Sequence, residues 1–511
     1  MSSSLTGPSI KIHPSKDECI FCILNFMNWW VLGRKIHISW LICVYCLGIL
    51  VGIFGARYVD PVSFSSYTWL IISLVVAVII FLRRYLYLLP VLIVGGIILG
   101  LWRGSAQEAS LNRIQPFFGV MSEVAGRVRE DADTNSSNKL VLRIDNLTVN
   151  SHLMVGTFWV TTNNDKDIKR SDEVTLEGKI SPGFGSFSGT MYTANVTKIQ
   201  RPEPGDIARE VRDWFAGAIR TAIPDPEASL GIGYLVGQKR ALPTDLVEAL
   251  QIAGLTHIVV ASGYNLTILV RLARRLFEKI SKYLSALSAS LMIFCFVTVT
   301  GLSPSMTRAG LVAGLSLLAW YYGRRFHPIV LLVFAATVTV MINPSYAWGD
   351  LGWQLSFAAF AGVMILAPLL QRYFFGDKKP GIVRQVVGET VSATILTAPV
   401  LIGAFGQISN VSIVANMLVL PLVPLAMLLT FISGVGALII PGLAAIIGLP
   451  ATWLLQYMVG VANYLSKLPF AVTKVQLPGL GILACYLIIL AVVIYLWRKT
   501  KFNFRDSNIV E

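Results

Sequence analysis

Long apolar blocks dominate this sequence. Three lie near its start, at about 38–56, 67–83 and 86–102, and each is close to the roughly 20 residues that a helix needs to cross a bilayer. Ten further blocks follow, at about 229–237, 250–270, 286–301, 307–323, 328–342, 351–371, 388–405, 411–440, 446–466 and 479–497. The pattern predicts a polytopic α-helical membrane protein.

A different pattern occupies residues 104–203, between the two groups of apolar blocks. Leu140, Leu142 and Ile144 alternate there with more polar positions, as in a half-buried strand. Runs rich in β-branched residues lie at 123–128, 139–149, 155–161, 174–180 and 191–199. Turn-forming stretches such as 131–138 separate these runs. Five short strands favour a small closed barrel of the OB-like type over an open sheet with bare edges.

An amphipathic helix is predicted next, from Asp206 to Ala222. Its apolar face contains Ile207, Val211, Trp214, Phe215, Ala218 and Ile219, and its polar face contains Arg209, Arg212, Asp213 and Arg220. Such a helix can lie in the membrane interface. Packing on the barrel or on the helical bundle explains the pattern equally well.

Composition and charge support the membrane assignment. The chain is 55% hydrophobic and 14% charged, with a mean hydropathy of +0.66, whereas soluble proteins carry about 25% charged residues. Most of the net charge of +14 lies in basic clusters beside apolar blocks, such as Arg83-Arg84 and Arg498-Lys499. Basic clusters mark the cytoplasmic side. The barrel is therefore expected outside the cytoplasm, and the protein in a bacterial cytoplasmic (inner) membrane.

These patterns divide the chain into five regions. They are an N-terminal region with three transmembrane helices (1–103), an extracytoplasmic OB-like domain (104–203), an amphipathic interfacial helix (204–225), a polytopic channel domain (226–497) and a basic cytoplasmic tail (498–511). Ser262-Gly263, Pro421 and Pro424 interrupt blocks of the channel domain. Broken helices at membrane depth are tolerated only inside protein or along wet cavities. We expect this domain to enclose a path.

Polar residues within these blocks are the candidate site residues, because each is costly in lipid. Arg308 follows Pro304-Ser305 at a helix start, where its cation and the free N–H groups would favour an anion such as phosphate. A snorkelling arginine or a structural ion pair is the alternative. Asp350 is expected to cap a helix. Gln354, Gln407 and Asn416 are candidate path amides, with interhelical hydrogen bonding as the rival explanation.

Motifs for catalysis, ATP hydrolysis and metal binding are weak or absent in the sequence. His257 and Ser262 suggest an intramembrane hydrolase, but their spacing places them about 500° apart on a helix. The sequence has no G-x-S-x-G, H-E-x-x-H or P-loop motif. Cys19/Cys22 and Cys43/Cys46 have zinc-ribbon spacing, but the second pair lies in an apolar run, which favours buried thiols. We expect no enzyme activity, no cofactor and no metal.

Four stretches of the channel domain resemble the ComEC family of competence proteins. They are Ala253–Asn265, which includes Gly254-Leu255-Thr256-His257 and Ser262-Gly263; Pro304–Gly310, which includes Arg308; Gly352–Ala359; and Phe405–Asn416. Their order matches the family over some 270 residues. The three spans, barrel and amphipathic helix before them also match its layout. The resemblance thus covers most of the chain.

The resemblance implies a channel for single-stranded DNA in natural transformation. Its path in the channel would include Arg308, Gln354, Gln407, Asn416, His257, Asn265 and Asp350. In the barrel, Phe158, Trp159, Phe184, Phe187 and Tyr192 would stack on bases, and Arg127, Arg129, Lys179 and Lys198 would meet phosphates. Because residues 104–203 carry eleven Lys and Arg against twelve Asp and Glu, the barrel alone is expected to bind weakly.

Partners follow from the same resemblance. They are single-stranded DNA, the lipid bilayer, a cytoplasmic DNA motor or helicase, DNA-delivery proteins outside and a separate nuclease. The nuclease is expected to be separate because the metallo-β-lactamase-like domain that ends many family members has no counterpart here. Asn265 stands where the family tends to carry histidine, and the barrel lacks the cysteines that form a disulfide in some relatives. A small-solute or lipid permease is the alternative function.

Overall fold

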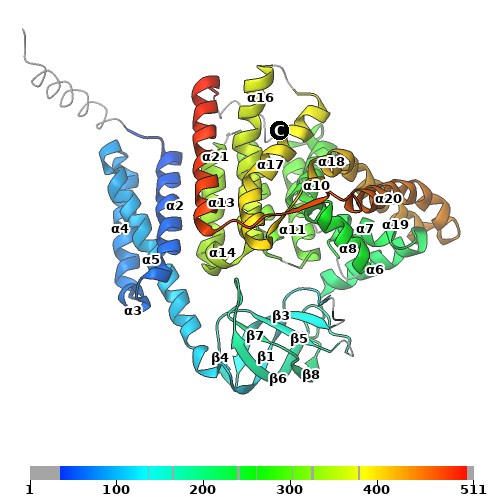
Figure 1. The fold of residues 1–511 in the computed structure, drawn as a ribbon, viewed down its shortest axis with the longest axis horizontal. Helices are drawn as coiled ribbons and strands as arrows, with labels where there is room; N and C mark the ends of the chain where they lie inside the picture. The colour runs from blue at the N-terminus through cyan, green and yellow to red at the C-terminus, as the bar shows by residue number, and fades with distance from the viewer. Residues whose placement is uncertain are drawn as a thin grey trace, which may run out of the picture.

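The structure, a computed structural model, describes residues 35–502 except 136, 138, 164–165, 239–241, 260–261, 302, 324–326 and 378–379. Its helices form one layer and a β-barrel lies beneath them (Figure 1). The predicted cysteine pair Cys19/Cys22 falls outside the described residues. The predicted fold class, a helical membrane protein with an inserted barrel, is confirmed.

The N-terminal unit contains three long helices, α2 (Ile38–Gly55), α4 (Tyr67–Arg83) and α5 (Leu89–Asn112), with short α3 (Pro61–Phe64) between the first two. Glycines allow α2 and α5 to approach closely. A Cβ added at Gly52 would lie 2.2 Å from the Ile97 carbonyl oxygen, and one at Gly100 would lie 2.2 Å from that of Ile49. Such small-residue faces are a common basis of helix packing in lipid. From this pair α5 continues down to the barrel (Figure 1).

The barrel is built from β1 (Met121–Val128), β2 (Asp133–Thr134), β3 (Leu140–Val149), β4 (His152–Leu153), β5 (Phe158–Thr162), β6 (Glu173–Pro182), β7 (Gly189–Met191) and β8 (Asn195–Gln200). Its sheet order β1-β3-β5-β7-β6 closes because β6 also pairs with β1, and β5 and β7 are parallel. This closed ring is compatible with an OB fold. The predicted alternation is confirmed, since Leu140, Leu142 and Ile144 all lie in the barrel core.

Helix α6 (Ile207–Ala222) connects the barrel to the bundle. Its Arg209 and Arg212, predicted on a polar face, are buried. Arg212 forms an ion pair with Asp131 of the barrel, and Arg209 Nη1 donates to the Arg170 carbonyl oxygen at 3.1 Å. On the bundle side, the Phe215 ring lies 5.8 Å from that of Phe431. The helix therefore packs on both barrel and bundle, as the alternative interpretation of its sequence proposed.

The remaining helices form the bundle. They are α7 (Glu227–Val236), α8 (Thr244–Ile252), α9 (Thr256–Val259), α10 (Gly263–Glu278), α11 (Lys282–Val299), α12 (Pro304–Tyr321), α13 (Pro328–Ile342), α14 (Ser345–Gly349), α15 (Leu351–Ala361), α16 (Ala367–Phe375), α17 (Ile382–Phe405), α18 (Ser412–Val419), α19 (Val423–Ile439), α20 (Ala444–Ser466) and α21 (Gly479–Thr500). A π-helical turn joins α15 to α16. Two short strands, β9 (Gln407–Ser409) and β10 (Val472–Lys474), pair with each other.

Eight helical segments in the described chain are long and apolar enough to cross a membrane. They are Ile38–Tyr58, Leu86–Phe117, Lys282–Val299, Leu351–Phe375, Val383–Phe405, Ser412–Ile439, Pro441–Ser466 and Gly479–Thr500. The structure also has two shorter apolar helices, Tyr67–Arg83 and Pro328–Ile342. The block 250–270 is interrupted at Ser262-Gly263, as predicted, and the chain also breaks at Ala253–Leu255, which was not predicted. Helix α7 is buried almost throughout and packs against α6, α19 and α20.

Candidate functional site

Arg308 is the most unusual polar residue of the bundle. It lies in the second turn of α12, and its side chain is only 4% exposed. Its Nη2 donates to the Gly352 carbonyl oxygen at 3.0 Å. Its Nε and Nη1 are buried and have no hydrogen-bond partner among the residues that the structure describes. A buried cation with unused donors is costly unless an acceptor is present, which makes this position suited to an anion.

Asp350 and Tyr346 lie within electrostatic range of Arg308. The Asp350 carboxylate accepts a 2.7 Å hydrogen bond from the Trp353 backbone N–H, which confirms the predicted helix cap of α15. One turn later, the Gln354 side-chain amide lies 3.4 Å from the Ala347 carbonyl oxygen and 3.5 Å from that of Trp348. Gln354 thus ties α15 to α14. These residues form a group at the α12–α14–α15 junction.

Three of the other predicted path residues lie around α9, α10 and α18. Asn265 is buried, and its Nδ2 donates to the Tyr234 carbonyl oxygen of α7 at 3.0 Å. His257 lies on the short helix α9. Asn416 of α18 is buried, and its Oδ1 has no partner within the described residues. Gln407 lies on β9, where it pairs with Lys474.

The four family-like stretches contact one another in succession. Ser409 Oγ donates to the Ile252 carbonyl oxygen at 2.6 Å, and a Cβ on Gly254 would meet the Ser412 Cβ at 2.5 Å. A Cβ on Gly263 would lie 3.2 Å from that of Ala309, the residue after Arg308. The Arg308–Gly352 hydrogen bond completes the series. Stretches that are separated by up to about 160 residues therefore form one continuous region of the bundle.

The hydrolase interpretation finds no support in the position of Ser262. Its Oγ donates to Asn265 Oδ1 at 3.1 Å and accepts from the Asn265 backbone N–H at 3.3 Å. The hydroxyl group therefore caps α10. In the described part of the chain, no group of three His, Cys, Asp or Glu residues could hold a metal ion. Cys43 and Cys46 are buried free thiols.

Four aromatic side chains predicted to stack on bases form a cluster on the barrel. The Trp159 ring lies 5.6 Å from Phe184 and 5.7 Å from Tyr192, and Phe184 lies 5.4 Å from Phe187. Phe184 and Tyr192 are about half exposed. Phe158 is different, because it is fully buried in the barrel core and is not available for stacking. The cluster is therefore a partly exposed aromatic surface.

The basic residues of the barrel differ in exposure and in hydrogen bonding. Lys179 and Lys198 are exposed on β6 and β8. Arg127 Nη2 donates to Ser171 Oγ at 3.1 Å, and Arg129 Nη2 donates to the Tyr346 hydroxyl of α14 at 3.2 Å. Burial acts to lower the pKa of Arg129, but Tyr346, Glu130 and Asp145 outweigh it and raise that pKa. Arg129 thus joins the barrel to the bundle as a cation.

Two further contacts dock the barrel on the bundle. Arg170, which is 4% exposed, donates from Nε to Asp206 at 2.7 Å and from Nη1 to the Val299 carbonyl oxygen at 3.0 Å. Gly185 lies so close to Gly349 that a Cβ on Gly349 would be 2.1 Å from the Gly185 carbonyl oxygen. Gly349 directly precedes Asp350. The loop that carries Phe184 and Phe187 therefore rests beside the Arg308 group.

Burial acts to raise the pKa of Asp206, but the hydrogen bonds from Arg170, the Arg209 backbone and Ser171 outweigh it and lower that pKa to about 2. Sequence reasoning found Asp206 as the first residue of the helix but missed Arg170 and Tyr346. No local pattern marks either residue, because both contacts join segments that are more than 30 residues apart.

These features define a class: a polytopic membrane protein whose inserted barrel docks on a bundle with a buried cationic site. Within that class, the chain belongs to the competence protein family, whose model matches residues 234–500. It is also similar to ComE operon protein 3 of Bacillus subtilis (strain 168), with 23% identity over 272 residues, which is 50% of this chain. The matched part is 33% of that relative, so the chain spans about a third of its length. No solved structure matches.

Proposed function

We propose that this protein passes single-stranded DNA across a bacterial cytoplasmic membrane during natural transformation. The observation that carries this proposal is the continuous contact among the four family-like stretches, with the buried Arg308 guanidinium at the end nearest the barrel. Competence-family membership supports DNA as the substrate. In this scheme the cytoplasmic face carries the basic helix ends, and the barrel lies outside.

The barrel and bundle would share the work of recognition. The aromatic cluster of Trp159, Phe184 and Tyr192 offers ring faces for bases of any sequence. Since the barrel has eleven basic and twelve acidic residues, we assign attraction of phosphate mainly to Arg308. Its unused Nε and Nη1 would donate to a phosphate oxygen in passing.

Transport through such a site would be passive. The strand must bind there without being trapped. The inward pull is assigned to a cytoplasmic motor or helicase. Delivery of DNA from outside and degradation of the second strand are assigned to separate proteins. Helix α6 would lie at the outer interface, with Ile207, Val211 and Trp214 toward lipid.

Substitution of Arg308 tests the proposal. Arg308→Glu reverses the charge that meets phosphate, so transformants should fall at least a hundredfold, while DNA bound at the cell surface is unchanged. Arg308→Lys should retain part of the activity. The matched control is Arg275→Gln, which removes an exposed charge at the far end of α10 and should leave transformation intact.

Each variant is measured for its amount in the membrane and for uptake of labelled DNA into the cytoplasm. Normal uptake by an Arg308→Glu protein that accumulates at the wild-type level would contradict the proposed path. It would assign Arg308 to packing.

A further inference from the structure

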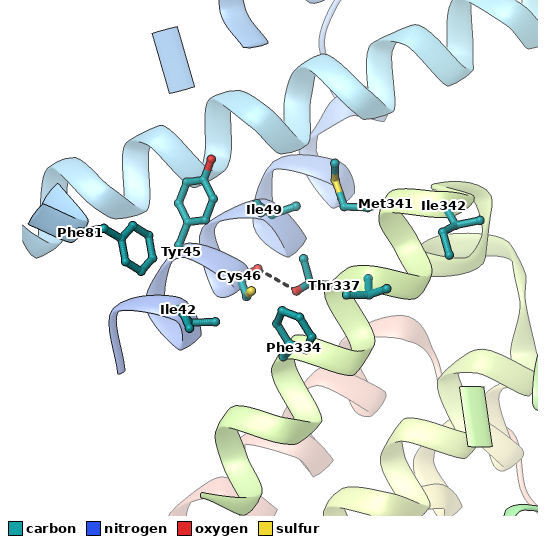
Figure 2. A pocket seen from close by; sticks show the side chains of 10 residues that line it. Ile42, Tyr45, Cys46, Ile49, Phe81, Phe334, Thr337, Met341 and Ile342 are labelled. Carbon is teal, nitrogen blue, oxygen red and sulfur yellow. Dashed lines mark hydrogen bonds between the residues drawn. The ribbon is translucent and has the colours of Figure 1, made fainter. Parts of the chain in front are cut away.

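An apolar groove of about 530 Å³ lies between the N-terminal unit and the bundle. Its walls are α2 and α13, with Phe81 of α4 at one end (Figure 2). The lining residues are Ile42, Tyr45, Cys46, Ile49, Phe81, Phe334, Thr337, Val338, Met341 and Ile342. This volume falls in the range of small-molecule sites. The DNA path proposed above makes no use of it.

The hydroxyl groups that line the groove are already engaged within the protein. Thr337 Oγ1 donates to the carbonyl oxygen of Val333 at 2.9 Å and lies 3.2 Å from that of Cys46, as the dashed line in Figure 2 marks. The Tyr45 hydroxyl lies 2.8 Å from Ser73 Oγ. Water in this groove would find few partners. An alkyl chain would suit these walls, and α2 and α13 are both apolar helices of membrane type.

Basic side chains gather where the groove reaches Phe81. Arg84 Nε donates to the Phe81 carbonyl oxygen at 3.2 Å. The Ile36 backbone N–H donates to the Arg84 carbonyl oxygen at 2.9 Å, and this bond brings Lys35 beside Arg84. Lys35, Arg83 and Arg84 are exposed, and none forms an ion pair with a residue that the structure describes.

We propose that this groove is a binding site for an anionic phospholipid. One acyl chain lies between α2 and α13, and the phosphate lies at Lys35, Arg83 and Arg84. An apolar slot that ends in basic residues at a membrane surface has the two features that select an anionic lipid over a neutral one. The lipid fills the space beside the α2–α13 contact, and so it stabilises the N-terminal unit against the bundle.

Lipid retention by the full-length protein tests this site. The protein is reconstituted with phosphatidylglycerol or phosphatidylcholine, delipidated in mild detergent, and examined by native mass spectrometry for bound lipid. The wild type should keep one phosphatidylglycerol preferentially. Arg83→Gln/Arg84→Gln should weaken that retention about tenfold. The matched control is Arg498→Gln/Lys499→Gln at the end of α21, which should have no effect.

A second pair of variants tests the acyl chain. Val338→Trp fills the groove and should remove the retained lipid, whereas Leu487→Trp on the exposed face of α21 should not. Equal losses in a variant and its matched control would overturn the proposal, because they indicate a general lipid shell. Equal retention of both lipids by the wild type would also overturn it. The charge variants change no buried packing, so they remain informative if Val338→Trp fails to fold.

Discussion

At the scale of single residues, the buried polar groups differ in whether their hydrogen bonds are complete. Asn265 donates to the Tyr234 carbonyl oxygen and accepts from Ser262, so its amide is used in holding α7 and α10 together. Arg308 keeps two donors without a partner in the described chain. In the sequence, Arg308 stood out as a polar group beside apolar blocks, and Asn265 stood out through the family resemblance. Only the hydrogen bonds in the structure distinguish Asn265, a structural amide, from Arg308, a candidate anion site.

The Asp206 carboxylate gives a pH dependence at this scale. Because its pKa in the folded protein is about 2, below its usual 3.8, its charge stabilises the Arg170 contact above about pH 4. That contribution is lost as the pH falls toward 2. The free energy of unfolding should be about 1–2 kcal/mol lower for Asp206→Asn than for wild type at neutral pH, after allowance for solvent screening.

Thermal unfolding in detergent at a series of pH values measures that difference. The gap between wild type and Asp206→Asn should close between about pH 4 and pH 2. Asparagine still caps a helix, so the comparison isolates the charge. Asp167→Asn is the control, because the Asp167 side chain is mostly exposed and pairs only with Lys169 in the described chain. A gap that does not change with pH would contradict the assignment.

At the scale of elements, polar–apolar alternation and apolar runs predicted strands and helices correctly where the whole segment lies in a single environment, either the barrel or the membrane. The predicted strands 123–128 and 139–149 match β1 and β3 to within two residues. The predicted interruption of the block 250–270 at Ser262-Gly263 is confirmed, but a second break was not predicted: Gly254 at φ +72° turns the chain between α8 and α9. The buried Arg209 and Arg212 of α6 also departed from expectation. Their acceptors, Arg170 and Asp131, are distant in sequence. The pattern of apolar and polar residues within a helix cannot predict such contacts.

The glycines of α2 and α5 form a sequence pattern from which the close packing of these two helices could have been predicted, but this prediction was not made. Gly48 and Gly52 are four residues apart, as are Gly96, Gly100 and Gly104, and this spacing is typical of close helix pairs in membranes. In Gly100→Ala the new Cβ would lie 2.2 Å from the Ile49 carbonyl oxygen. We expect a loss of about 1–3 kcal/mol of stability from the forced separation of the helices.

Gly460→Ala is the matched control for that prediction. Gly460 lies inside α20 with open space around it, so alanine there should be neutral or stabilise the helix by up to about 1 kcal/mol. Melting temperatures of the two purified variants provide the measurement. If Gly100→Ala melts like Gly460→Ala, the α2–α5 contact is looser than the structure has it.

Helix α6 yields a second prediction for an element. Val211 is exposed beside Trp214, whereas the neighbouring Glu210 side chain points elsewhere and is 61% exposed. If the Val211 face lies in the membrane interface, a fluorophore on Val211→Cys should be quenched by lipids labelled in the acyl chain. The same fluorophore on Glu210→Cys should be quenched much less. Equal quenching at both positions would show that the apolar face of α6 does not meet lipid.

At the scale of the whole molecule, the arrangement of barrel and bundle was beyond sequence reasoning. Its contacts pair Arg129 with Tyr346, Gly185 with Gly349, and Arg170 with Val299, all across more than 100 residues. Each is a single polar or backbone contact with no periodic pattern. Family-like motifs singled out four stretches of the bundle. The fold adds that these stretches meet each other and that the barrel rests at one end of them.

This arrangement has a consequence for transport, because Arg308 is almost completely buried while the barrel is docked beside it. A strand that approaches from the barrel side can reach the guanidinium only if the barrel or α14 moves. A linker between Arg129→Cys and Tyr346→Cys should therefore stop DNA uptake, in a background without other reactive cysteines. Cleavage of a reducible linker should restore uptake in the same cells.

The control for the linker joins the barrel to itself, between Glu123→Cys and Glu177→Cys, which are exposed and opposite each other on β1 and β6. That linker leaves the docking contacts free and should leave uptake unchanged. Transformation frequency before and after reduction measures both proteins. Undiminished uptake by the protein whose barrel is linked to α14 would mean that the strand reaches the membrane without passing between barrel and bundle. The route to Arg308 would then have to open from another side of α12.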